Sequence, residues 1–247
     1  MAGFKDVPDE LLCLIFSNFN TFEKVQLLSC VCRRWRRVSK GRYVWKKVLL
    51  GYQRYVTRET FDKLVYSTTT EISIDECYLE WKEVKKVIQR CLKLTNFSCS
   101  WIGYDGKTTL DLSGVNGFQN LKFLNISHCV MDDVTLRNLP CICPNLKILF
   151  LAACKSVHHQ VLRSSKFKRS RLEILNIAYC LPGKQMSDSA QNLQTFIEVF
   201  KYNGCLTKVD ITGVYLSDDD YDELLRVHDG VEERILEVAD YQQLLPW

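Results

Sequence analysis

Hydrophobic positions follow helical spacing in the first 50 residues. From Leu11 to Phe19 they recur at i, i+1, i+4, i+5 and i+8, which indicates one apolar stripe on a helix. Pro8 suits the first helical position, where a missing N–H costs nothing. Further stripes at 25–31 and 35–48 predict three to four short helices. Since so few residues make a small core, we expect a helical partner to cover one face.

A different pattern, L-x-x-L-x-L-x-x-C, recurs through the rest of the chain. Its copies are LKFLNISHC (121–129), LKILFLAAC (146–154) and LEILNIAYC (172–180), with the variants LTKVDITGV (206–214) and TTEISIDEC (69–77). Each copy predicts a short strand followed by a return segment, with its terminal Cys turned inward. One repeat cannot bury its apolar side alone, so the repeats must stack. Weaker strand candidates are 94–99 and 109–112, and 181–190 is an insertion.

The N-terminal module resembles an F-box over residues 5–49. That family has a Leu-Pro start, an Ile-Phe pair, a Val-Cys-Arg-x-Trp core and a later Leu-Trp. The matching positions here are Val7-Pro8, Ile15-Phe16, Val31-Cys32-Arg33-Arg34-Trp35 and Val44-Trp45. Val7 replaces the usual Leu, and SKGRYVW is more basic than the family's approach to the Trp. Cys143-Pro144-Asn145 before Leu146 resembles the opening of the cysteine-containing subclass of leucine-rich repeats.

Together these patterns predict an α/β chain, with a helical F-box followed by a leucine-rich-repeat solenoid. Short parallel strands would line its concave face, and helices or loops its convex face. The expected domains are an F-box (1–50), a linker or first solenoid helix (51–68), the repeats (69–215), and a C-terminal cap helix and tail (216–247).

The resemblance implies a partner for the N-terminal module. F-boxes dock on a Skp-type adaptor, which bridges to a cullin–RING ligase. By matching position, the adaptor-binding candidates are Pro8, Leu12, Ile15, Val31, Cys32, Trp35 and Trp45. We expect some of them to be core residues instead. Apolar anchors would supply affinity, and the arginines would speed and orient docking.

Strand residues between the inward-facing positions point to the concave face, because side chains alternate along a strand. The substrate-binding candidates on this face are Phe123, Asn125, Ile148, Phe150, Ile174, Asn176, Lys208 and Asp210. The middle of the set is apolar and its flanks are polar. Exposed apolar clusters of this kind mark interaction sites. The alternative is that the C-terminal tail, or a second layer of the protein, covers this face.

Charge is unevenly distributed. The net charge is +4, but residues 33–47 hold eight basic residues and no acidic one, which leaves −4 for the rest (+4 − 8). The basic stretch indicates a local acidic partner rather than nucleic acid. A solvated face and a nuclear-import patch remain alternatives.

Other features narrow the class of protein. The twelve cysteines include no C-x-x-C pair, and Cys129, Cys154 and Cys180 close the same apolar motif, which favours buried, reduced thiols and a cytoplasmic or nuclear chain. No apolar run is long enough to span a membrane, and no signal peptide is visible. Ser217 before three aspartates predicts a helix cap. His158-His159 and the basic 166–171 are read as surface features. No catalytic motif, metal set or cofactor loop is present.

The sequence therefore predicts a non-catalytic subunit: the substrate receptor of an SCF-type (Skp adaptor–cullin–F-box) ubiquitin ligase, which binds a protein target. The alternative is a non-ligase scaffold or complex-assembly protein. In both cases we expect no enzyme activity and no binding to nucleic acid or membrane.

Overall fold

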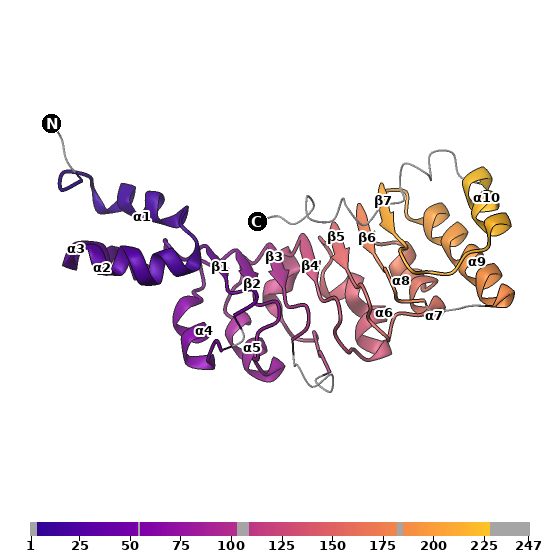
Figure 1. The fold of residues 1–247 in the computed structure, drawn as a ribbon, viewed down its shortest axis with the longest axis horizontal. Helices are drawn as coiled ribbons and strands as arrows, with labels where there is room; N and C mark the ends of the chain where they lie inside the picture. The colour runs from indigo at the N-terminus through magenta and orange to yellow at the C-terminus, as the bar shows by residue number, and fades with distance from the viewer. Residues whose placement is uncertain (1–3, 54, 103–108, 182–184, 228–247) are drawn as a thin grey trace.

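A ladder of seven parallel strands organises the chain (Figure 1). The computed structural model describes residues 4–53, 55–102, 109–181 and 185–227. The strands are β1 (Lys47–Leu49), β2 (Glu71–Ser73), β3 (Asn96–Ser98), β4 (Phe123–Asn125), β5 (Ile148–Phe150), β6 (Ile174–Asn176) and β7 (Lys208–Asp210). Their order in the sheet follows their order in the sequence. Such an array is a solenoid, in which each repeat contacts its neighbours.

Helices fill the segments between and beyond the strands. The N-terminal part contains α1 (Asp9–Ser17), the π-helix η1 (Glu23–Leu28), α2 (Ser29–Val31) and α3 (Arg33–Ser39). The later helices are α4 (Arg58–Leu64), α5 (Trp81–Ile88), the 3-10 helix η2 (Asn116–Asn120), α6 (Asp133–Ile142), α7 (His159–Leu162), α8 (Ser165–Lys168), α9 (Met186–Tyr202) and α10 (Asp218–Val227). In Figure 1, α4 to α8 lie along one side of the strand row, which confirms the predicted α/β solenoid.

The core is built from columns of equivalent side chains, one per repeat. The middle residue of every strand points inward, as Ile72, Leu124 and Leu149 show with exposures of 0%, 0% and 1%. The residue after each strand does the same, because side chains alternate. In-register pairing of neighbouring strands, such as Leu124 with Leu149, aligns these positions into continuous apolar columns. The alternation inferred from the repeat motif is therefore observed.

Buried cysteines form a further column. Cys77, Cys129, Cys154 and Cys180 each lie four residues after a strand. Each thiol donates a hydrogen bond to a backbone carbonyl of the preceding repeat, for example Cys180 Sγ to Leu151 O at 2.9 Å and Cys154 Sγ to Ile126 O at 3.1 Å. Burial raises the pKa of Cys77 and Cys180 to about 12, so these thiols remain protonated donors at neutral pH. All twelve cysteines are free.

A left-handed backbone residue follows each strand at a constant distance. Three residues after β1 to β7, φ is positive at Tyr52, Glu76, Trp101, His128, Ala153, Tyr179 and Gly213. The six non-glycine residues have φ between 54° and 66°, a conformation that costs roughly 1–2 kcal/mol for an L side chain. The cost is offset by a repeated hydrogen bond, since each of these six N–H groups donates to a carbonyl of the next repeat.

Two details of the strand pattern differ from expectation. Residues 109–112 form no strand; Thr109 makes a single parallel bridge to Val130, while Leu110 and Leu112 are buried. The repeat between β3 and β4 instead uses η2 to return. The second difference is β1, which the sequence did not predict. It lies in the predicted F-box range and pairs in register with β2.

The helical N-terminal part is joined to the solenoid through β1. Thr69 Oγ1 donates to Trp45 O at 2.8 Å, and Thr68 Oγ1 donates to Arg42 O at 2.8 Å. On the outer edge of β1, Leu49 N donates to Thr21 Oγ1 at 2.8 Å. A side chain before η1 thus satisfies a backbone donor on an edge strand.

At the other end, Ser217 accepts a hydrogen bond from Asp220 N and caps α10, as its sequence position predicts. No helix in the described ranges has the length and hydrophobicity to cross a membrane.

Gly117 provides a test of how closely the repeats are stacked. A Cβ at this position would lie 2.5 Å from the backbone oxygen of Cys91. We expect Gly117→Ala to lower the free energy of unfolding by about 1–3 kcal/mol, because backbone atoms must move apart. Gly204→Ala is the control, since nothing lies within 4 Å of its added Cβ. Chemical denaturation measures both, and equal stability of the two variants would contradict the packing described.

Candidate functional site: the exposed surface of the N-terminal helices

Exposed aliphatic side chains are concentrated in the N-terminal helices. Among the described residues, six of the eight exposed Leu, Ile and Val side chains fall between residues 11 and 31. These six, called the exposed aliphatic set below, are Leu11, Leu14, Ile15, Val25, Leu27 and Val31. Their exposed fractions run from 40% to 60%. A concentration of this kind marks an interaction surface, whereas single exposed apolar residues are normal.

The helix α1 is apolar on two sides. Leu12 and Phe16 face inward and are fully buried. Leu11, Leu14 and Ile15, spaced i, i+3 and i+4, share another face that is open to solvent. A helix that is hydrophobic beyond one stripe is normally covered on both sides. The outer face of α1 is therefore a candidate binding surface.

Trp35 is half-buried and packs against the core of the N-terminal helices. Its ring packs against Phe16 with centroids 4.8 Å apart and against Phe4 at 5.5 Å. Cys32 precedes α3 in an extended conformation, and its sulfur accepts a hydrogen bond from Trp35 N at 3.4 Å. This contact caps α3 and directs the indole toward α1.

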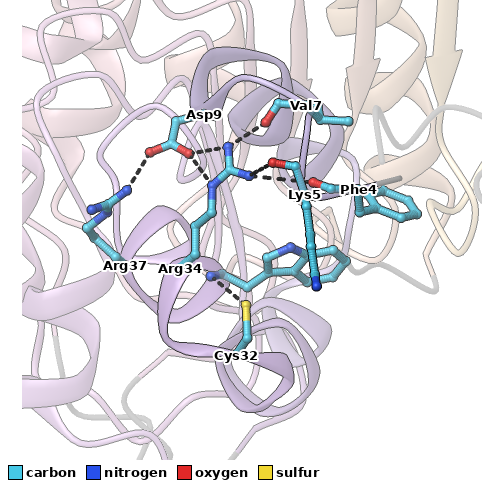
Figure 2. A network of polar contacts seen from close by, with 8 residues as sticks. Phe4, Lys5, Val7, Asp9, Cys32, Arg34 and Arg37 are labelled. Carbon is cyan, nitrogen blue, oxygen red and sulfur yellow. Dashed lines mark hydrogen bonds and ion pairs between the residues drawn. The ribbon is translucent and has the colours of Figure 1, made fainter. Parts of the chain in front are cut away.

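Arg34 ties the segment before α1 to α3 (Figure 2). Its Nε donates to Asp9 Oδ1 at 2.8 Å, and its Nη1 donates to Lys5 O at 2.8 Å. A further guanidinium nitrogen donates to Val7 O. Arg37 Nη2 contacts the other oxygen of Asp9 at 2.8 Å. The planar guanidinium, with several donors, suits this combination of one carboxylate and several carbonyls.

The same contacts explain part of the basic stretch. Arg34, followed by Arg37, holds the pKa of Asp9 below its usual range. Lys47 pairs with Glu71 on the neighbouring strand at 2.9 Å. These three cations of residues 33–47 therefore have partners within the chain. For the other five basic residues of this stretch, contact with an acidic external partner stays a prediction.

The structure separates the seven adaptor-binding candidates by exposure. Pro8, Ile15, Val31 and Cys32 are exposed, and Trp35 is half-buried. Leu12 is fully buried and Trp45 is 4% exposed, with its Nε1 donating to Ser39 O at 2.8 Å. These last two are core residues of the unbound chain. We expected that some of the seven candidates would be core residues, and Leu12 and Trp45 are such residues.

Sequence reasoning missed most of the exposed aliphatic set. Leu11, Leu14, Val25 and Leu27 were not among the candidates. The available signal was the number of apolar residues in 11–16, which exceeds what one helical stripe can bury. The periodicity alone did not distinguish the inner face from the outer one.

The eight concave-face candidates fall into two rows across neighbouring strands. Pairing aligns Phe123, Ile148, Ile174 and Lys208 in one row, and Asn125, Phe150, Asn176 and Asp210 in the other. Half of the set is buried, and the other half is intermediate in exposure. The buried members are Phe123, Phe150, Asn176 and Asp210, with exposures of 5% or less. The predicted cover by the C-terminal tail concerns residues 228–247, outside the described ranges.

Exposed aromatic side chains line the edge beyond the strand ends. Tyr52, Trp101 and Tyr179 belong to the row of left-handed residues and are 52–73% exposed. Trp101 stacks on His128 with ring centroids 4.1 Å apart. Burial lowers the pKa of His128, which favours the neutral imidazole. Exposed aromatic rings gathered along one edge are typical of interaction surfaces.

The histidines and basic residues singled out in the sequence make contacts between repeats. No cluster of three or more His, Cys, Asp and Glu residues that could hold a metal occurs in the described ranges. His158 Nε2 contacts Asp133 Oδ1 at 2.8 Å, and His159 Nδ1 contacts Thr195 Oγ1 at 2.9 Å. Lys168, from the basic segment 166–171, pairs with Glu198 at 2.6 Å. These contacts serve to pack one repeat on the next.

Comparison with known proteins assigns a family to the helical N-terminal part of the chain. Residues 4–51 match the family model described as F-box-like. The comparison with curated proteins found no match. Among solved structures, the chain is similar to an internalin from Listeria monocytogenes, with 12% sequence identity, a TM-score of 0.39, and coverage of 87% of this chain and 73% of the internalin. The chain thus has an F-box-like domain, and the solenoid assignment rests on its own strand ladder.

The Arg34 contacts predict the titration of Asp9. We expect Arg34→Gln to raise the pKa of Asp9 toward 3.8, because the largest cause of its lowering is removed. Since the folded-state pKa lies below the unfolded one, the stability from these contacts is present above the unfolded pKa and is lost as pH falls through the folded pKa. Carbon NMR of the carboxyl group measures the titration. Arg33→Gln is the control, and an unchanged Asp9 pKa in Arg34→Gln would contradict the assignment.

Proposed function

We propose that the chain is the substrate-recognition subunit of an SCF-type ubiquitin ligase. In this proposal the F-box-like domain binds a Skp-type adaptor, and through it a cullin–RING ligase, while the solenoid binds a protein target. The observation that carries the proposal is the exposed aliphatic set on a domain that matches the F-box-like model.

The energetics favour a partner on this surface. Full burial of a Val, Leu or Ile side chain contributes roughly 1.5–3 kcal/mol. Several such side chains on short helices would give substantial affinity after the entropic cost of association. The chain itself leaves them 40–60% exposed. Arg33 and Lys46 are also exposed, have no ion-pair partner among the described residues, and suit an acidic adaptor.

The proposed mechanism is proximity. The chain supplies no reacting groups in this mechanism; it holds the target near a ubiquitin-transfer centre and so raises the local concentration of the reactants. The joint between the F-box-like domain and the solenoid matters here, because a shared strand ladder fixes the direction in which the target is presented. We propose a cytoplasmic or nuclear location, where reduced cysteines persist.

We propose that the target binds to the side of the sheet that carries the two rows of concave-face candidates. The exposed aromatic residues beyond the strand ends, Tyr52, Trp101 and Tyr179, would extend this binding surface. Asn125, Ile148, Ile174 and Lys208 retain exposed surface in the first region. Trp101 and Tyr179 supply exposed rings in the second. Aromatic residues with limited side-chain freedom are common anchors of protein interfaces.

The adaptor surface can be tested without disturbing the core. We expect the double variant Leu14→Glu/Leu27→Glu to lose binding to a Skp-type adaptor by about a hundredfold or more, because both exposed side chains would place charge in an apolar contact. Since these residues are 60% and 59% exposed, the fold should remain intact. Surface plasmon resonance with purified adaptor measures the affinity, and circular dichroism verifies the fold.

A matched control comes from the solenoid. Leu92 is 57% exposed and lies outside the F-box-like domain, so Leu92→Glu makes the same chemical change elsewhere. We expect its adaptor affinity to equal that of the wild type. Absence of wild-type binding, or equal binding by the folded double variant, would overturn the proposed ligase role.

A further inference from the structure

A cavity lies where the F-box-like domain meets the first helix of the solenoid. It has a volume of 390 Å³. Its lining residues come from η1, α2, the ends of α3 and α4, and the segments that follow these two helices. They are Lys24, Val25, Ser29, Ser39, Lys40, Trp45, Lys63, Leu64 and Tyr66. This junction cavity therefore lies between the two functional parts of the chain. Its size falls in the range of small-molecule sites.

Lys24 is the unusual residue of this cavity. It is only 1% exposed, although lysine is almost never fully buried without a partner. Among the described residues its ammonium has no hydrogen-bond acceptor; its one recorded contact is the face of the Trp45 ring, 5.6 Å from the centroid. Burial, followed by the nearby charge of Lys47, lowers the pKa of Lys24 to about 8. Lys24 thus lines the cavity as a charged residue without a hydrogen-bond acceptor among the described residues.

The backbone around Lys24 is also unusual. Glu23–Leu28 form a π-helix, a conformation that is rare and occurs frequently at functional sites. Within this turn Lys24 is buried, while Val25, Gln26 and Leu27 are exposed. The local conformation therefore directs a lysine, rather than an apolar residue, toward Trp45.

The charged residues that line the cavity have one sign, and Glu23, whose charge raises the pKa of Lys24, lies outside the lining. Lys40 and Lys63 are exposed lining residues, and neither forms an ion pair in the described part of the chain. No Asp or Glu lines the cavity. The hydroxyl groups of Ser29, Ser39 and Tyr66 donate to backbone carbonyls, so their oxygens retain acceptor capacity only. Three lysines thus belong to the lining, together with the apolar side chains of Trp45, Leu64 and Val25.

We propose that the junction cavity binds a small organic phosphate. Its phosphate would lie between the ammonium groups of Lys24, Lys40 and Lys63, and its apolar part would pack along Leu64 and Val25. A phosphate monoester carries −1.5 to −2 charges at pH 7 and three acceptor oxygens, which match three cationic donors. A single carboxylate would leave more of the positive charge uncompensated.

Occupation of the cavity would link η1 and α3 to α4. The ligand would then stabilise the joint between the F-box-like domain and the solenoid, because anything that binds the folded state alone raises stability. This inference does not depend on ligase membership, since it concerns a cavity within one chain.

The test uses the full chain and three probes. Phenyl phosphate carries both the anion and an apolar body, inorganic phosphate carries the anion alone, and phenol carries the apolar body alone. We expect phenyl phosphate to bind saturably by calorimetry, to bind more tightly than either fragment, and to raise the melting temperature. Added salt should weaken the binding. No binding of phenyl phosphate at millimolar concentration would overturn the proposal.

Substitutions then test whether phenyl phosphate binds in the junction cavity. We expect Lys24→Met, an apolar change of similar length, to weaken phenyl phosphate binding by about tenfold or more, the effect of losing a charge-assisted hydrogen bond. Lys46→Met removes an equal charge from the same domain outside the cavity, and we expect wild-type affinity. Equal binding by folded Lys24→Met and wild type would overturn the site.

A second variant covers the case in which Lys24→Met does not fold. Lys40→Met/Lys63→Met changes only exposed lining residues, and we expect it to weaken binding by about tenfold while leaving the unliganded melting temperature unchanged. Unchanged affinity in this double variant would contradict the proposal.

Discussion

The structure depends on parallel pairing between strands of only three residues. One such strand, with its return segment, buries too little apolar surface to persist alone, so each repeat is stable only between its neighbours. The columns of inward-facing Leu, Ile and Cys side chains exist because pairing keeps all seven strands in register. The thiol hydrogen bonds and the left-handed residues recur for the same reason, since each connects one repeat to the next.

This constraint also joins the N-terminal helices to the repeats. β1 belongs to the segment that matches the F-box-like model, yet it is the first rung of the ladder. Thr21 satisfies a backbone donor on its outer edge, and Thr69 bonds back to Trp45 from the next repeat. The domain therefore ends the solenoid and covers its edge strand. The proposed function uses this rigidity, because a target must be held in a fixed position relative to the ligase.

Much of the fold could be predicted because its signals are local and repeated. Cys129, Cys154 and Cys180 close the same motif, and each is buried as expected. β1 could not be predicted, because Lys47–Leu49 carries no repeat motif and becomes a strand only through pairing. Residues 109–112 have a strand-like pattern but form no strand. The strands before and after them in the chain, β3 and β4, pair directly with each other.

The candidate site was less accessible to sequence reasoning. Helical spacing identified α1 and placed Leu11, Leu12 and Ile15 on one stripe, but it did not show that Leu12 is internal while Leu11 and Ile15 are exposed. Family matching likewise selected Trp45, a core residue. Phe123 and Phe150 are buried on the predicted concave face, and strand alternation shows the side of the sheet but not the exposure of a residue.

The central claim is that the N-terminal helices form a binding surface for an adaptor. Amide hydrogen exchange of the full chain, with and without a purified Skp-type adaptor, tests it most directly. The account predicts slower exchange in α1 and in the η1–α2 segment, with β3 to β7 unchanged. Unchanged exchange in α1 and η1–α2, or slower exchange confined to the strand ladder, would contradict it.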